Sequence, residues 1–134
     1  MNKALALLAV AVFFAAGTAW SEEPSVKSMP PSVVKAIPQC GDTNVDSSAA
    51  KQIKVTFSKD MMDGSWSWSQ ISAETFPRIV GKPRYLDDKR TCVLNVELEA
   101  KRTYVVWFNT EKLSGFKDTD GKSAVPYLLV FQTK

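Results

Sequence analysis

Cys92-Val-Leu-Asn-Val-Glu-Leu-Glu-Ala-Lys-Arg-Thr-Tyr-Val-Val-Trp-Phe-Asn109 is the stretch that decides the fold. Apolar and polar residues alternate in its first half, a period of two that is typical of a half-buried strand. Ala100–Arg102 interrupts the pattern, and Thr103–Phe108 resumes as the β-branched and aromatic run that strands prefer. The stretch therefore predicts two strands joined by a polar corner. Tyr104 opens the second strand, where a β-sandwich often has a tyrosine whose hydroxyl bonds back across the corner.

Strand patterns of similar length occur along the rest of the chain. Ile53, Val55 and Phe57 alternate with polar residues, and serines alternate with Trp66 and Trp68. The predicted strands are 32–37, 52–58, 65–71, one or two within 78–88, 92–99, 103–108 and 125–132. Asp-Gly turns and prolines separate them, and no stretch after the N-terminal leader has helical periodicity. We therefore expect one all-β domain, a sandwich of about seven short antiparallel strands.

The absence of histidine limits the possible chemistry more than any other feature of the composition. Histidine is the commonest general base and a principal zinc ligand, so Ser-His-Asp and Cys-His mechanisms are excluded. The net charge is only +3, and basic residues are scattered among acidic ones, unlike the massed basic face of a nucleic-acid binder. We expect no catalytic residue, no metal, no cofactor and no nucleic-acid partner.

The N-terminal residues have the pattern of an export signal. Lys3 precedes an apolar run, Ala4–Ala19, that is short for a membrane span but suits the core of a signal peptide. Cleavage after Ser21, or after Ala19 as the second choice, gives a signal peptide at 1–21, a flexible proline-containing leader at 22–31 and a domain at 32–134. We expect a periplasmic or extracellular protein with no membrane span once the signal is removed.

Four segments in series carry a family resemblance. They are Ser32–Pro38, Ile53–Met61 with its Val-x-Phe-Ser-x-x-Met pattern, Leu98–Tyr104, and Asp118–Gly121. In this series the chain resembles the bacterial Ig-like domain of the S-layer SbsA type over about residues 32–133. The resemblance implies an Ig-like Greek-key sandwich, and it implies a non-catalytic module, since most members are modules of surface or periplasmic proteins. Fold resemblance alone does not identify a partner.

Cys40 and Cys92 are the only cysteines, and two cysteines in an exported protein can form a disulfide. In an Ig-like order, however, the first and fifth strands run the same way in one sheet, with Cys40 past the end of the first and Cys92 near the start of the fifth. Their separation would be about 15 Å, beyond the Cα limit of about 7 Å for a bridge. We expect both thiols to be unpaired, with Cys92 buried and inert and Cys40 on a loop, open to an intermolecular bond.

Trp66 and Trp68 are two residues apart, so both rings leave the same face of their strand. That face is either part of the core, with the serines on the polar side, or an aromatic platform that stacks on a sugar or a peptide. Trp107 is a third candidate, which would widen such a platform at the surface of the sandwich.

Paired carboxylates are the only other chemistry that the sequence offers. Asp87-Asp88 and Glu97/Glu99 are glycosidase candidates by residue type alone, in a domain with little room for a cleft. Asp118-x-Asp120-Gly121 begins like a calcium loop but lacks the later ligands, so we interpret it as a hairpin turn.

The function expected from the sequence is therefore an exported, non-catalytic module for protein binding or envelope assembly. Its partner would be a protein, docked at a sheet edge or on the tryptophan face. The alternatives are a module that binds a cell-envelope glycan through its tryptophans and, less favoured, a small carboxylate-based hydrolase.

Overall fold

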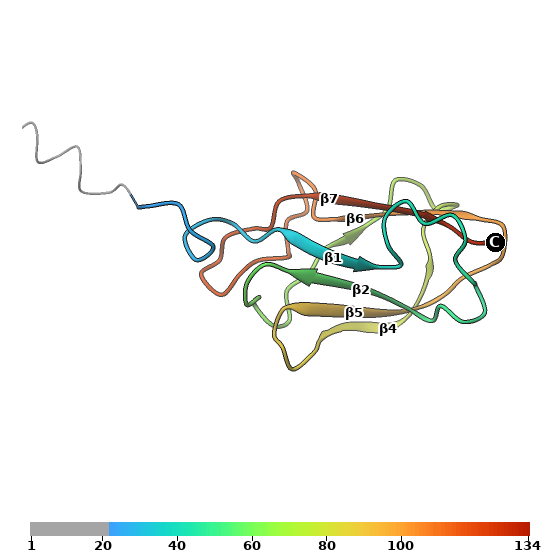
Figure 1. Ribbon diagram of the computed structural model, residues 1–134, viewed down its shortest axis with the longest axis horizontal. Coiled ribbons are helices and arrows are strands. Elements are labelled where there is room, and N and C mark those ends of the chain that lie inside the picture. The colour runs from blue at the N-terminus through green and yellow to red at the C-terminus, as the bar shows by residue number, and fades with distance from the viewer. Residues whose placement is uncertain (1–21) are drawn as a thin grey trace, which may run out of the picture.

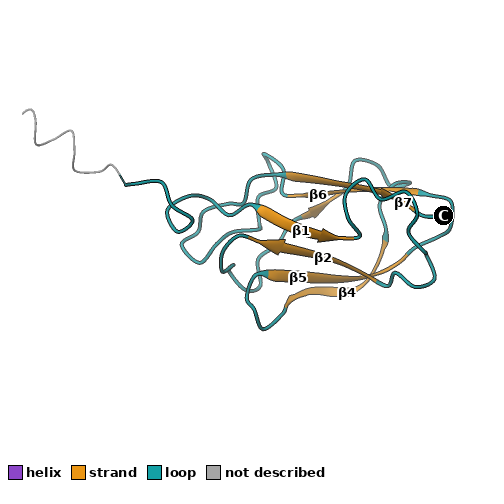
Figure 2. Cartoon of the chain, viewed as in Figure 1, coloured by secondary structure: helices purple, strands orange, loops and turns teal. Residues whose placement is uncertain are grey.

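Two antiparallel sheets pack face to face in the computed structural model, which describes residues 22–134 (Figure 1). The larger sheet has the order β1-β2-β5-β4, with β1 at Val33–Ile37, β2 at Gln52–Phe57, β5 at Thr91–Glu97 and β4 at Arg78–Tyr85. The smaller sheet has the order β3-β6-β7, with β3 at Trp68–Ser69, β6 at Thr103–Phe108 and β7 at Tyr127–Gln132. Figure 2 shows only strands and loops in the described residues, so the predicted all-β sandwich is confirmed.

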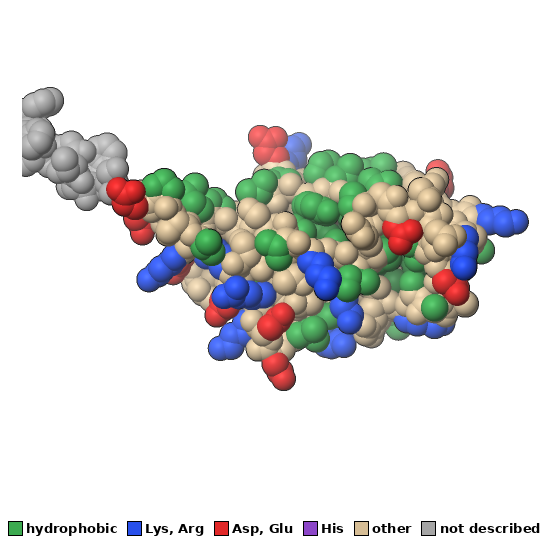
Figure 3. Space-filling model, viewed as in Figure 1, with side chains coloured by type: hydrophobic (Ala, Val, Ile, Leu, Met, Phe, Trp, Pro, Cys, Tyr) green, Lys and Arg blue, Asp and Glu red, His purple; other side chains and the backbone are tan. Residues whose placement is uncertain are grey.

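The predicted signal peptide, residues 1–21, lies outside the described residues. Within residues 22–134 we find no helix with the length and apolar character that a membrane crossing requires. On the face drawn in Figure 3, basic and acidic side chains are interspersed over the surface.

Alternation along the strands builds the core, as the sequence predicts. Inward-facing residues of β2 and β5 meet those of β6 and β7, and Phe116 from a loop completes the layer between the sheets. The fully buried side chains with the largest volumes are Phe57, Phe108, Phe116, Phe131, Ile53, Leu94 and Leu129. The third strand is shorter than the predicted 65–71; before it, the Ser65 hydroxyl donates to the Gly115 carbonyl and the Ser67 carbonyl accepts the Asn109 N–H.

The corner between β5 and β6 has the predicted tyrosine. Tyr104 is buried, its ring stacks on Phe131, and its hydroxyl accepts a hydrogen bond of 2.8 Å from the backbone N–H of Glu99. Thr133 donates its hydroxyl to the carbonyl of the same Glu99 at 2.6 Å. Both backbone groups of Glu99 are thus hydrogen-bonded, which holds the corner to the core.

The leader makes backbone hydrogen bonds within itself and to the sandwich. Composition predicts a flexible segment at 22–31, but Ser25–Met29 forms a turn in which the Met29 N–H donates to the Ser25 carbonyl at 3.0 Å. Farther along, the Val125 N–H donates to the Pro31 carbonyl at 3.0 Å. These contacts use backbone carbonyls, which every residue has, so no side-chain pattern in the leader indicates them.

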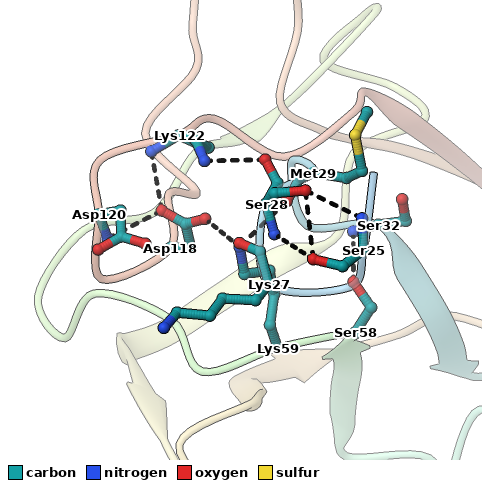
Figure 4. Close-up of polar contacts among 10 residues, drawn as sticks. All are labelled: Ser25, Lys27, Ser28, Met29, Ser32, Ser58, Lys59, Asp118, Asp120 and Lys122. Atoms are coloured by element: carbon teal, nitrogen blue, oxygen red, sulfur yellow. Dashed lines mark hydrogen bonds and ion pairs between the residues drawn. The ribbon is translucent and has the colours of Figure 1, made fainter. Parts of the chain in front are cut away.

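The Lys59 ammonium binds the turn of the leader to the sandwich (Figure 4). It donates to the carbonyls of Lys27 at 2.6 Å and Met29 at 3.0 Å, and it forms an ion pair with Asp118 at 2.7 Å. These three oxygens match the three N–H groups of an ammonium. The side chains of Lys59 and Asp118 are 11% and 1% exposed, so the pair is almost withdrawn from water.

Asp118 is also the residue that shapes the predicted hairpin turn. Its Oδ1 accepts the backbone N–H groups of Asp120 at 2.9 Å and Lys122 at 2.8 Å. The Lys122 ammonium in turn donates to the Ser28 carbonyl of the leader at 2.8 Å (Figure 4). The turn and the leader therefore form one polar cluster around a buried carboxylate, which the turn motif alone does not indicate.

Asp118→Asn should destabilise the domain by about 3–5 kcal/mol, because breaking a buried ion pair leaves the Lys59 ammonium without its counter-charge. The leader should also loosen. Urea unfolding measures the first effect, and hydrogen exchange of the amides in 25–31 measures the second. Asp120→Asn, on the exposed end of the same turn, is the control and should change little.

The same substitution should change the response to acid. Burial alone would raise the pKa of Asp118, but the Lys59 ammonium and the N–H groups of Lys122 and Asp120 outweigh it and hold this pKa below its usual value. A lowered pKa contributes stability that is full above the unfolded pKa of about 3.9 and is lost as pH falls through the folded pKa. The difference in unfolding free energy between the native chain and the variant should therefore shrink as the pH falls below about 4, the unfolded pKa; a constant difference would contradict the assignment.

Tyr104→Phe should cost about 1 kcal/mol of unfolding free energy while leaving the ring packing intact, because only the hydroxyl contact to Glu99 is removed. Tyr85→Phe is a matched control, since the Tyr85 hydroxyl has only a 3.5 Å contact to the Ser65 carbonyl. Equal unfolding midpoints for Tyr104→Phe and the native chain would show that the corner bond contributes nothing.

Candidate functional site

Trp66 and Trp68 each lie half in the core and half at the surface. Trp68 pairs with Phe108 across β3 and β6, so its ring faces inward, edge-to-face with Phe108 at 5.0 Å and with Phe116 at 5.7 Å. The buried Nε1 of Trp68 has no hydrogen-bond partner, so packing holds the ring in place. One side of these rings therefore packs against the core, and the other side faces the surface.

The exposed sides of these rings line a groove of about 360 Å³ between the edges of the two sheets. Leu94 of β5, itself 1% exposed, lies at its floor. The opposite walls come from β4 and from a loop after β6, where Ile79 and Leu113 are 42% and 57% exposed. The lining is mainly apolar and has no carboxylate or amide side chain: Trp66, Ser67, Trp68, Ser69, Ile79, Gly81, Lys82, Pro83, Leu94 and Leu113.

An irregularity in β4 shapes one wall of this groove. Val80 pairs with Asn95 and Arg84 pairs with Val93, so four steps along β4 match two steps along β5. Gly81 within this bulge has a φ of 81°, a conformation that a side chain would strain. Bulges of this kind bend a strand and redirect its side chains, which turns residues 81–83 into the groove wall.

Asn109 holds the other wall. It follows β6 with a φ of 64° and is fully buried. Its side-chain nitrogen donates to the carbonyls of Phe116 at 2.9 Å and Ala124 at 3.0 Å, and its Oδ1 accepts the Phe116 N–H at 2.9 Å. The loop that carries Leu113 is thereby fixed against Trp66, and a Cβ on Gly115 would clash with the Trp66 carbonyl oxygen.

Trp107 does not join this groove. It pairs with Leu128 of β7 and with Ser69, and it lies one residue before the inward-facing Phe108. Successive residues of a strand point to opposite faces, so Trp107 lies on the outer face of the smaller sheet. Trp107 is thus at the surface of the sandwich, as alternation along the strand predicts, and it is not among the residues that line the groove with Trp66 and Trp68.

A larger hollow of about 600 Å³ lies on the larger sheet, beside the β2–β5 pair. Gln52 donates to Asn95 there at 3.1 Å, and no aromatic side chain lines it. The groove between β3 and β4 is the better candidate site, because it combines aromatic walls with strand edges.

The two cysteines are free, with Cys92 in β5 and Cys40 after β1. β1 and β5 flank β2 in one sheet and run in the same direction, the strand arrangement from which the sequence predicts that Cys40 and Cys92 are too far apart for a disulfide. Cys40 is exposed and its thiol donates to the Leu128 carbonyl at 3.4 Å. Burial raises the pKa of Cys92 to about 12, so its thiol stays protonated.

The candidate carboxylates have local structural partners. Asp88 accepts the Thr91 hydroxyl at 2.6 Å, and this hydrogen bond lowers its pKa. Glu97 lies 3.7 Å from Arg78, and Glu99 lies 2.8 Å from Arg102. Across residues 22–134, no three Asp, Glu or Cys side chains converge in a way that would hold a metal ion.

Comparison with known families matches residues 27–133 to the bacterial Ig-like domain. The chain belongs to this family. The match begins inside the leader, in agreement with the contacts of Lys27 and Met29 to the sandwich.

Solved structures of an S-layer protein have a similar fold. The N-terminal part of the S-layer protein SbsC aligns with a TM-score of 0.52 at 22% identity, covering 81% of this chain and 24% of that one. Domains 1–6 of surface layer protein SbsC align with a TM-score of 0.51 at 22% identity, covering 78% of this chain and 14% of that one. The Ig-like chain thus spans at most a quarter of the length of these structures, and the likeness concerns the fold.

No curated protein matches the chain. The predicted family is confirmed at the level of the bacterial Ig-like domain, whereas the SbsA type in particular stays a prediction. Family and fold are consistent with a non-catalytic envelope module. The groove itself was not predictable as a unit, because its walls come from four segments distant in sequence; only the Trp66/Trp68 spacing pointed to it.

The thiols give a direct test of burial. In the native protein, Cys40 should react with a thiol reagent within minutes, and Cys92 should react only after unfolding, because it is 0% exposed and protonated. Cys40→Ser should abolish the fast reaction. Fast reaction of both thiols, or of neither, would contradict this assignment.

Proposed function

We propose that the protein is an exported, non-catalytic Ig-like module that binds a protein partner of the cell envelope through the groove between β3 and β4. The groove carries the proposal, since it is where two sheet edges, two tryptophans and exposed apolar side chains meet. Half-exposed aromatic rings beside aliphatic residues are typical of the pockets that receive a partner's anchor side chain. Export is supported by the predicted signal peptide and is consistent with the family.

The chemistry of the lining favours a protein over a glycan as the partner. Trp66 and Trp68 offer apolar surface, but the polar groups of the groove are two serine hydroxyls and one ammonium, from Ser67, Ser69 and Lys82. Specificity for a polar ligand depends on several placed hydrogen-bonding groups. An apolar side chain of a partner fits this lining better than a hydroxyl-rich sugar does.

Site-specific photo-crosslinking in cells tests the proposal. A crosslinking residue at position 113 should capture one protein of the envelope, and the same residue at Val34, which is 62% exposed on β1, is the control. Adding Ile79→Glu should reduce capture at 113 by at least about fivefold, because it places a charge in an apolar contact. Equal capture from both positions, or capture unaffected by Ile79→Glu, would rule out the groove as the docking site.

The glycan alternative has its own readout. Trp66 and Trp68 line the groove, so a bound glycan should change the tryptophan fluorescence of the native chain. A saturable change with soluble cell-wall fragments, without any protein captured at position 113, would favour the carbohydrate-binding module.

A further inference from the structure

The four outer strands of the sandwich differ in what covers their free edges. The edge of β7 is covered by the segment after β1, with bonds from Gly41 to Val130 at 2.7 Å and from Val45 to Gln132 at 3.1 Å. In the smaller sheet the other outer strand, β3, has only two residues. In the larger sheet β1 has five residues, and β4 has eight. Within residues 22–134, β4 pairs only with β5, so β4 presents the longest uncovered edge in the described part of the chain.

All the charged residues of β4 are basic. Arg78, Lys82 and Arg84 lie on β4, and no acidic residue lies between 78 and 85. The ion pair of Arg78 with Glu97 is 3.7 Å long between side chains that are 80% and 61% exposed, so it constrains Arg78 little. Two copies of β4 side by side would bring like charges together, which opposes self-pairing. The same charges favour a strand that carries carboxylates.

The register defines where those carboxylates would lie. Arg78 pairs with Glu97 and Arg84 pairs with Val93, so the two arginines point to one face and match positions four residues apart on a regular strand. Ile79, between them, pairs with Val96 and lines the groove on the other face. A regular strand on the free side of β4 would therefore meet the arginines at positions i and i+4 and the groove at i+1 and i+3.

We propose, building on the docking function proposed above, that the partner contributes an extended acidic segment that adds as a strand to the free edge of β4. Carboxylates at i and i+4 pair with Arg78 and Arg84. Apolar side chains at i+1 and i+3 enter the groove above Leu94, between Ile79 and the tryptophans. Backbone hydrogen bonds supply affinity, and the alternating side chains supply specificity.

Peptide titrations of the exported chain test this proposal. Three soluble peptides share the core x-Leu-Val-Leu-x, with Glu, Gln or Lys at both x positions, and binding is followed by calorimetry and by tryptophan fluorescence. The Glu peptide should bind about tenfold more tightly than the Lys peptide, since two opposite-charge cross-strand pairs replace two like-charge pairs. The preference should decrease with added salt.

A charge exchange provides the decisive control. Arg78→Glu/Arg84→Glu should reverse the preference towards the Lys peptide, whereas Lys35→Glu/Lys134→Glu, with the same change in net charge at exposed positions in β1 and at the end of the chain, should keep the native preference. Equal reversal by both double variants would overturn the proposal, because the effect would then follow total charge.

The remaining outcomes separate this proposal from the docking function. Equal binding of the Glu and Gln peptides would overturn the acidic segment while leaving the groove as a docking site. If no peptide binds but position 113 still captures a partner, strand addition is overturned and docking stands. Self-association through β4, seen as a dimer in sedimentation that Arg78→Glu/Arg84→Glu alters, would identify a second copy as the occupant and overturn the acidic partner.

Discussion

The groove depends on one buried side chain, Asn109. A residue at the end of a central strand, held with a positive φ, would ordinarily be a weak point in a sandwich. Here its amide makes three hydrogen bonds to backbone groups of Phe116 and Ala124, so a long irregular loop behaves as part of the core. That loop brings Phe116 under Trp68 and holds Leu113 beside Trp66. The tryptophans therefore line a stable wall.

The open edge of β4 is protected against self-pairing and is also the edge at which we propose the partner binds. Sandwich proteins must prevent their outer strands from pairing with other chains, and basic residues, a proline and a bulge are common means. β4 has all three, in Arg78, Lys82, Arg84, Pro83 and the residues around Gly81. The charges disfavour an identical edge in particular, whereas the proline and the bulge limit pairing by any added strand to the residues on either side of 81–83, and none of these features closes the groove behind the strand. Because like charges repel a second copy of β4, this edge remains available to a segment of opposite charge, such as that of the proposed partner.

Sequence patterns predicted strands better than they predicted surfaces. The alternation in β2 and β5 and the tyrosine of the corner follow directly from local periodicity, so the sequence alone was enough to place both. The spacing of Trp66 and Trp68 indicated a shared face but not which side of each ring is covered. Alternation along β6 also indicated that Trp107 lies at the surface, but not that it lies outside the groove lined by Trp66 and Trp68. The contacts of the leader could not be predicted from its sequence, because Lys59 and Asp118, 59 residues apart, meet only in the folded chain.

By itself the sequence determined the all-β class, the approximate strand positions and the exclusion of histidine-dependent chemistry, since these depend on composition and on contacts between near neighbours along the chain. Only the tertiary structure decided which edges stay open, where the three tryptophans point and how the leader is held. Those features depend on strand order and register, and on polar groups such as Asp118 and Asn109 that become buried next to distant backbone atoms. Local sequence patterns carry no information about such long-range pairings, because the energy that selects them arises only when the two sheets pack together.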